Sequence, residues 1–109
     1  MSRRADAHAA LLRHLQARLA RAGLAAELQA SHSERWASAT FTGARHRFHF
    51  AAAGLAESVD ARIARVAAEL GEHDLPLPDH IVADIALLPH STEPDGMRFE
   101  VEALTVEAR

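Results

Sequence analysis

The stretch that decides the fold runs over residues 24–50 and reads LAAELQASHSERWASATFTGARHRFHF. Apolar and polar residues alternate along much of it, and a period of two is typical of half-buried β-strands. Gly43 and Ala44 suit the central positions of a tight hairpin turn, because glycine at the first position reaches the required backbone angles. A second turn near His32 and Ser33 would divide the rest. We therefore expect three consecutive antiparallel strands here.

The two turns predict one apolar sheet face between them. Counting outward from the first turn, three pairs face one another on one side of the hairpin: Phe41 with His46, Ala39 with Phe48, and Ala37 with Phe50. The second turn places Leu24, Ala26 and Leu28 on that same side. Because a slip of one residue would bury Arg47, the register is well specified. We expect Phe48 to be buried in the core.

Two helices and two further strands complete the predicted chain. Residues 5–22 and 55–70 carry apolar side chains at helical spacing, and Gly23 and Gly71 follow where a left-handed residue ends many helices. Residues 80–88 and 97–106 alternate as strands. The connector 72–79 contains Pro76 and Pro78, and residues 89–96 form the longest predicted loop.

These elements predict a single α+β domain over residues 1–109. The order is α-β-β-β-α-β-β, with an antiparallel sheet of about five strands and both helices on one face, giving two layers. The first five elements share their order with double-stranded-RNA-binding domains, and the whole order is similar to that of the small acidic chaperones of type III secretion without their last helix. The RNA-binding domains carry lysines at the start of the second helix, where this chain has Glu57 and Asp60. Both likenesses concern topology, which does not fix function.

Composition narrows the possible functions. The formal net charge is −3, which disfavours non-specific binding of nucleic acid. The chain has no cysteine. It also has no lysine and is rich in alanine, and these two features of composition are typical of a GC-rich bacterial genome. We expect a cytoplasmic protein, since no apolar run approaches the roughly 20 residues that span a bilayer and the start lacks the pattern of a secretory signal.

The sheet face without helices is the predicted binding surface. It would carry the interface candidates Trp36, Arg45, Arg47, His49, Glu27 and Gln29. Asp84, Glu100 and Glu102 would add an acidic strip from the last two strands. Basic and acidic patches on one face can pair across a two-fold axis. We expect a non-enzymatic protein-binding, adaptor or chaperone-like domain that forms a homodimer and could take another protein as partner.

Two other functions stay open. The first is a small-ligand or enzymatic site near the 89–96 loop, beside His80. The second is RNA binding, with bases stacking on Trp36 while Arg45 and Arg47 hold phosphates. The sequence has no nucleophile-elbow or phosphate-loop motif, and the eight histidines show no metal-ligand spacing, since His46 and His49 point to opposite sheet faces. We expect no cofactor, no metal and histidines scattered at the surface.

Overall fold

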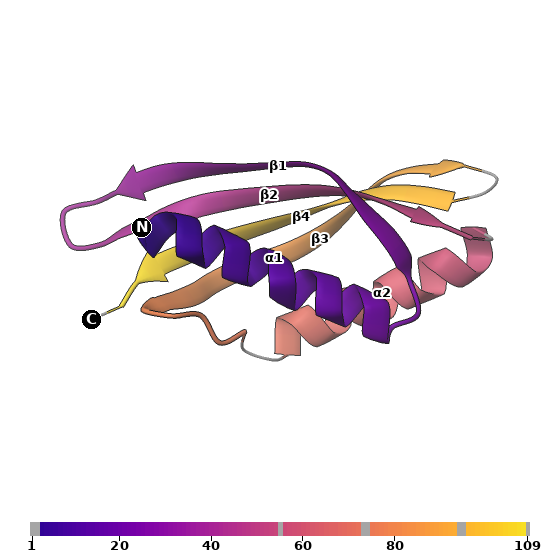
Figure 1. Cartoon of the computed structure of the whole chain (residues 1–109), viewed down its shortest axis with the longest axis horizontal. Helices are drawn as coiled ribbons and strands as arrows, with labels where there is room; N and C mark the ends of the chain where they lie inside the picture. Colours follow the sequence, from indigo (N-terminus) through magenta and orange to yellow (C-terminus); the bar gives the residue numbers. More distant parts are fainter. Residues whose placement is uncertain (1–2, 55, 73–74, 94–95, 109) are drawn as a thin grey trace.

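The computed structural model describes residues 3–54, 56–72, 75–93 and 96–108. The elements are α1 (Arg3–Arg21), β1 (Ala25–Ala37), β2 (Thr42–Ala53), α2 (Ala56–Glu72), β3 (His80–Glu93) and β4 (Gly96–Glu107). The strands form one antiparallel sheet in the order β1-β2-β4-β3, and both helices lie on the same side of it (Figure 1). In the part of the chain described, neither helix has the length and apolarity needed to cross a membrane.

The α+β class and the antiparallel sheet are confirmed, but the expected five strands are four. The order is α-β-β-α-β-β, so the first five elements no longer share the order of double-stranded-RNA-binding domains. The likeness to the type III secretion chaperones loses a strand in the same way. The difference lies entirely within residues 24–50, where one long strand replaces two short ones.

The turn expected near His32 and Ser33 is absent, because both residues lie within β1 and pair with β2. The real turn spans residues 38–41. There the Ser38 N–H donates to the Phe41 carbonyl at 2.8 Å, and the Phe41 N–H donates to Ser38 Oγ at 3.1 Å. Phe41 is therefore a turn residue and is 57% exposed, whereas the expected register placed it in the core with Ala37 and Ala39.

Gly43 is a strand residue of β2 and not part of a turn. It pairs with Trp36 on β1 and with Val106 on β4. A Cβ at this position would collide with the Thr105 carbonyl and would lie 3.0 Å from Cε2 of the Trp36 indole. Close packing of the ring and the neighbouring backbone therefore explains this glycine.

The core fills the space between the helices and the sheet. Phe48 and Phe50 on β2 and Phe99 on β4 are buried, and the rings of Phe50 and Phe99 stack with centroids 5.3 Å apart. The expected helix stripes face them: Leu11, Leu15 and Leu19 on α1, and Val59, Ile63, Val66 and Leu70 on α2. The prediction that Phe48 is buried is confirmed.

The helix ends agree with the sequence at only one of the two predicted glycines. Gly23 has φ 79° and follows α1, with the Gly23 N–H donating to the Ala20 carbonyl and the Leu24 N–H to the Leu19 carbonyl. This is the double hydrogen bond of a Schellman C-terminus. Gly71 lies within α2, so its predicted role as a stop is wrong.

The second hairpin contains far less loop than expected. β3 continues from His80 to Glu93, so most of the predicted 89–96 loop is strand, and residues 94–95 lie outside the described part of the chain. Two β-bulges interrupt its pairing with β4, one between Val82 and Asp84 and one between Pro89 and Ser91. The second bulge leaves His90 without a ladder partner, which bears on the site below.

Candidate functional site

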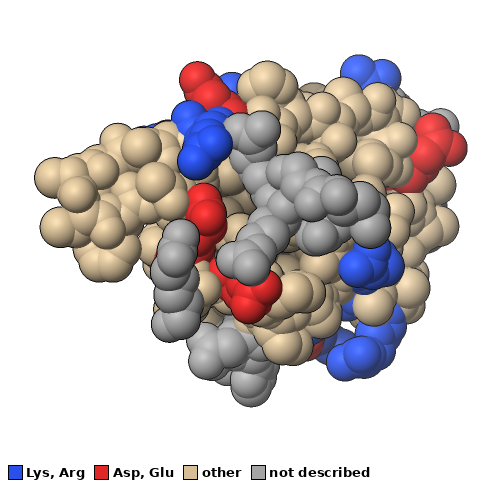
Figure 2. Space-filling view, turned by 60° about the vertical axis from the view of Figure 1, so that its left-hand side comes forward, with Lys and Arg blue, Asp and Glu red and all other residues tan. Residues whose placement is uncertain are grey.

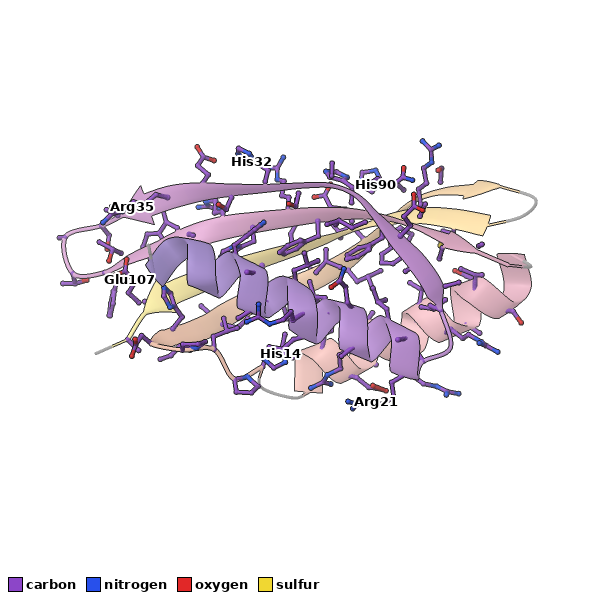
Figure 3. The ribbon with its side chains drawn as sticks, in the orientation of Figure 1. His14, Arg21, His32, Arg35, His90 and Glu107 are labelled. Carbon is purple, nitrogen blue, oxygen red and sulfur yellow. The ribbon has the colours of Figure 1, made fainter. Side chains whose placement is uncertain are left out.

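The open face is the side of the sheet turned away from α1 and α2. Register sets its residues in five rows across the sheet, written here in the order β1, β2, β4, β3. They are Trp36, Gly43, Val106 and Ile81; Glu34, Arg45, Leu104 and Asp84; His32, Arg47, Glu102 and Ala86; Ala30, His49, Glu100 and Leu88; Glu27, Ala51, Arg98 and Ser91. The labelled side chains of His32 and His90 stand on this side, opposite the helices (Figure 3).

The structure places five of the six predicted interface residues in these rows. Trp36, Arg45 and Arg47 follow one another down adjacent rows, and His49 and Glu27 lie further along. The sixth, Gln29, occupies a bulge in β1 between Leu28 and Ala30 and lines a hollow at that end of the face.

The first two rows form an apolar end of the open face. Ile81 is 58% exposed, and Leu104 and Val106 are half-buried although both described helices, α1 and α2, lie on the other side of the sheet. The Trp36 indole lies over Gly43. Its Nε1 is buried without a hydrogen-bond acceptor among the described residues. A buried donor that lacks a partner costs roughly 1–3 kcal/mol.

The third and fourth rows carry side chains of opposite charge next to one another. Arg47 Nε lies 3.7 Å from Glu102 Oε1, and His49 Nε2 lies 3.5 Å from Glu100 Oε1. The expected separate basic and acidic strips are therefore neighbours within one chain, because β2 and β4 are adjacent in the sheet. Seen from the end at the β1–β2 turn, positive and negative groups are interspersed over the surface (Figure 2).

Three potential metal ligands meet at the end of the open face formed by its fourth and fifth rows, which we call the polar end. His49 comes from β2, Glu100 from β4 and His90 from the bulge in β3. His90 Nε2 lies 3.2 Å from Glu100 Oε1, and the ligand atoms of all three residues lie within 4.8 Å of one another. The sequence spacing predicted histidines scattered at the surface, whereas strand pairing brings these two together with Glu100.

Glu100 is the buried member of the trio, with a side chain only 8% exposed. Burial raises its pKa, but a hydrogen bond with Glu102 and the charges of His49 and His90 outweigh burial, so the pKa lies below its usual value. The same hydrogen bond raises the pKa of Glu102. The Glu100 carboxylate is thus ionised at neutral pH.

A second pair of histidines lies on the opposite face, beneath α1. His8 Nδ1 lies 2.8 Å from His46 Nδ1, and His46 Nε2 lies 2.9 Å from Thr105 Oγ1. His46 is 1% exposed, so the expectation of surface histidines fails here too. Burial, with the nearby His8 and His80 rings, lowers the pKa of His46 to about 4. Both rings are therefore neutral near pH 7, since the pKa of His8 is also lowered, by burial and by His32.

Sequence spacing could not find either histidine cluster. His8 and His46 are brought together by the packing of α1 on β2, and the trio needs the β2–β4 and β3–β4 pairings together. The one usable signal was parity, which correctly placed His46 and His49 on opposite faces. Comparison with protein-family models, with curated proteins and with solved structures found no match to this chain.

Proposed function

We propose that this chain is a non-enzymatic protein-binding domain that pairs with a second copy of itself through the open face. The observation that carries the proposal is the apolar end of that face. The apolar end consists of adjacent rows that carry Trp36, Ile81, Leu104 and Val106, and α1 and α2 both lie on the other side of the sheet. Sheet faces exposed to water normally carry polar side chains, and contiguous exposed apolar residues mark interaction sites.

Charge complementarity favours a second copy as the occupant. Arg45 and Asp84 flank Leu104 from opposite sides in one row, and neither has an ion pair within 4 Å among the residues described. A two-fold axis running along β4 would set Leu104 against its own copy. The same rotation would bring Arg45 opposite Asp84 of the second copy. Because the rotation acts on both copies, an Arg45–Asp84 ion pair would form on each side of the Leu104 contact.

The dimensions of the molecule suit such a contact. Its extents are 46 × 24 × 23 Å, and the strands follow the longest one (Figure 1). Trp36 at the apolar end is the side-chain type that most often anchors interfaces.

Sedimentation velocity over a range of concentrations tests the proposal. Ile81→Asp puts a charge into the apolar end of the open face and should shift the chain to monomer, while wild type sediments as a dimer. Ala64→Asp is the matched control, because Ala64 is exposed on α2 in the opposite layer. A wild-type chain that stays monomeric at high concentration would overturn self-association, and equal dissociation in both variants would show that added charge alone is responsible.

RNA binding gains no supporting observation. Arg47 is already beside Glu102, and the row of Arg45 also contains Glu34 and Asp84. The acidic neighbours of both arginines oppose the approach of a phosphate backbone. The other alternative, a small-ligand site near residues 89–96, is supported by the position of His90 beside Glu100.

A further inference from the structure

We propose that His49, His90 and Glu100 bind a divalent transition-metal ion, with Zn²⁺ the best match. The three side chains come from three neighbouring strands, β2, β3 and β4, and converge at the polar end of the open face. They supply two imidazole nitrogens and one carboxylate oxygen. The site is distinct from the apolar end that carries the proposed dimer contact, and it does not depend on that contact.

The distances match those between ligands of one metal. Zinc binds nitrogen and oxygen at roughly 2.0–2.2 Å, so two ligands at neighbouring corners of a tetrahedron lie roughly 3.4 Å apart. The two observed nitrogen–oxygen distances to Glu100 Oε1 are 3.5 Å from His49 and 3.2 Å from His90. The longer one exceeds the usual length of an N–H···O hydrogen bond. The ligand atoms of all three residues lie within 4.8 Å of one another, so binding one ion needs only a small movement of the two imidazole rings towards each other.

The β-bulge in β3 positions the third ligand. Pairing skips from Pro89 to Ser91, so the extra residue, His90, is released from the ladder beside Glu100. Bulges commonly re-aim a side chain next to a functional site. A second bulge, at Gln29 of β1, lies at the same level on the other edge of the sheet. Both edges therefore depart from regular pairing where the trio is located.

Burial and access suit a site with an open coordination position. Glu100 is almost fully buried, while the His49 and His90 side chains are 45% and 53% exposed. A hollow of about 390 Å³ adjoins the two histidines, which leaves room for water or another ligand on the metal. Three protein ligands with a free fourth position are typical of catalytic rather than structural zinc sites.

The donor set selects the class of metal. Two imidazoles and a single carboxylate favour Zn²⁺ and its transition-metal neighbours over Mg²⁺ and Ca²⁺, which prefer oxygen ligands. Arg98 lines the same hollow and lowers the attraction for any cation. We therefore expect the ion to exchange with solution and not to be required for folding.

Calorimetric titration of the full chain with ZnCl₂ and with MgCl₂ tests the site. We expect one Zn²⁺ per chain and no heat from Mg²⁺ beyond dilution. His90→Ala should weaken binding by more than about 100-fold, because even groups that only orient ligands are worth 10–100-fold. His49→Ala should do the same, and each variant's circular dichroism should match wild type.

His32→Ala is the matched control, since His32 is an exposed histidine two strands away from Glu100 on the same face. It should bind Zn²⁺ like wild type. Ile81→Asp should also bind normally, which separates this site from the proposed dimer contact. Binding that is equally strong in His90→Ala, His49→Ala and wild type, or equal loss in His32→Ala, would overturn the assignment of these three ligands.

Discussion

His46 and His49 lie three residues apart on β2, yet they enter opposite chemical environments. His46 is enclosed beneath α1 with His8 and Thr105, and its neighbours are other neutral or uncharged groups. His49 stands on the open face beside the Glu100 carboxylate and His90. The alternation of a strand thus assigns one histidine to structure and the other to binding.

The buried cluster forms one consistent chain of neutral hydrogen bonds. Thr105 Oγ1 donates to the Ala44 carbonyl at 3.4 Å, so it accepts from His46 Nε2–H. His46 Nδ1 is then an acceptor and receives His8 Nδ1–H. His8 Nε2 in turn accepts from Ser31 Oγ at 3.2 Å. Each donor meets an acceptor, and a proton added to either ring would set two N–H groups against each other.

The largest expected effect comes from breaking the packing of the buried side. Phe48 is fully buried and stacks on the His8 ring with centroids 4.6 Å apart. Phe48→Ala should destabilise the fold by ~3–5 kcal/mol, the usual cost of deleting a core aromatic ring. Urea denaturation followed by circular dichroism measures it. A shift below 1 kcal/mol would mean that the two faces have been assigned the wrong way round.

Acid should break the same cluster with a somewhat smaller effect. His46 titrates at about 4 when folded and near 6.5 when unfolded, so the unfolded chain binds more protons between these values. The contribution of His46 to the stability of the fold is therefore fully present above pH 6.5 and is lost as the pH is lowered towards 4. At about 1.4 kcal/mol for each pH unit, His46 should account for a loss of about 3 kcal/mol.

The groups that face His46 are His8 from α1, Thr105 from β4 and His80 at the start of β3. Urea midpoints at several pH values give the slope. His46→Gln should remove most of it, because an amide keeps hydrogen bonds but does not titrate here. A wild-type stability that stays flat from pH 7 to pH 4 would contradict a buried neutral pair.

Trp36→Ala should act on the open face instead. We expect self-association to weaken by ~2 kcal/mol or more, the usual threshold for an interface anchor. The fold should survive, because the main core lies on the other face. Sedimentation and urea denaturation of the same variant distinguish the roles. Unchanged association together with a stability loss as large as that of Phe48→Ala would make Trp36 a core residue.

The smallest effect is expected for His49 itself. His49→Ala should change the free energy of unfolding by less than about 0.5 kcal/mol, since its side chain is half-exposed and Glu100 keeps His90 and Glu102 as neighbours. His46→Ala is the matched comparison and should cost clearly more, because it leaves His8 and Thr105 with unpaired buried groups. Equal losses in thermal denaturation would remove the contrast between the two faces.

The hydrophobic periodicity and the glycine signals in the sequence correctly predicted those parts of the fold that depend on neighbouring residues. The stripe of Leu11, Leu15 and Leu19, the Gly23 terminus and the strict alternation from Phe48 to Phe50 all gave correct structure. The long β1 was missed for two reasons. Gly43 resembles a turn residue but serves the packing of Trp36, and the true turn at residues 38–41 contains no Gly, Pro, Asn or Asp.

The candidate site could be predicted only in part. Parity alone placed Arg45, Arg47 and His49 on one face. The bulge at Gln29 changes the parity of β1, so counting along the strand could not relate Leu28 to Trp36. The trio at Glu100 depends on strand order and on a second bulge, both set by pairings between residues far apart in sequence.

Fluorescence of Trp36 tests most directly the claim that the open face joins two copies, because Trp36 is the only tryptophan in the chain. We expect a blue-shifted emission, protected from quenchers, in concentrated protein. On dilution the emission should move to the red over the same concentrations at which sedimentation shows dissociation. An emission that stays constant while the dimer dissociates, or a chain that is monomeric throughout, would contradict it.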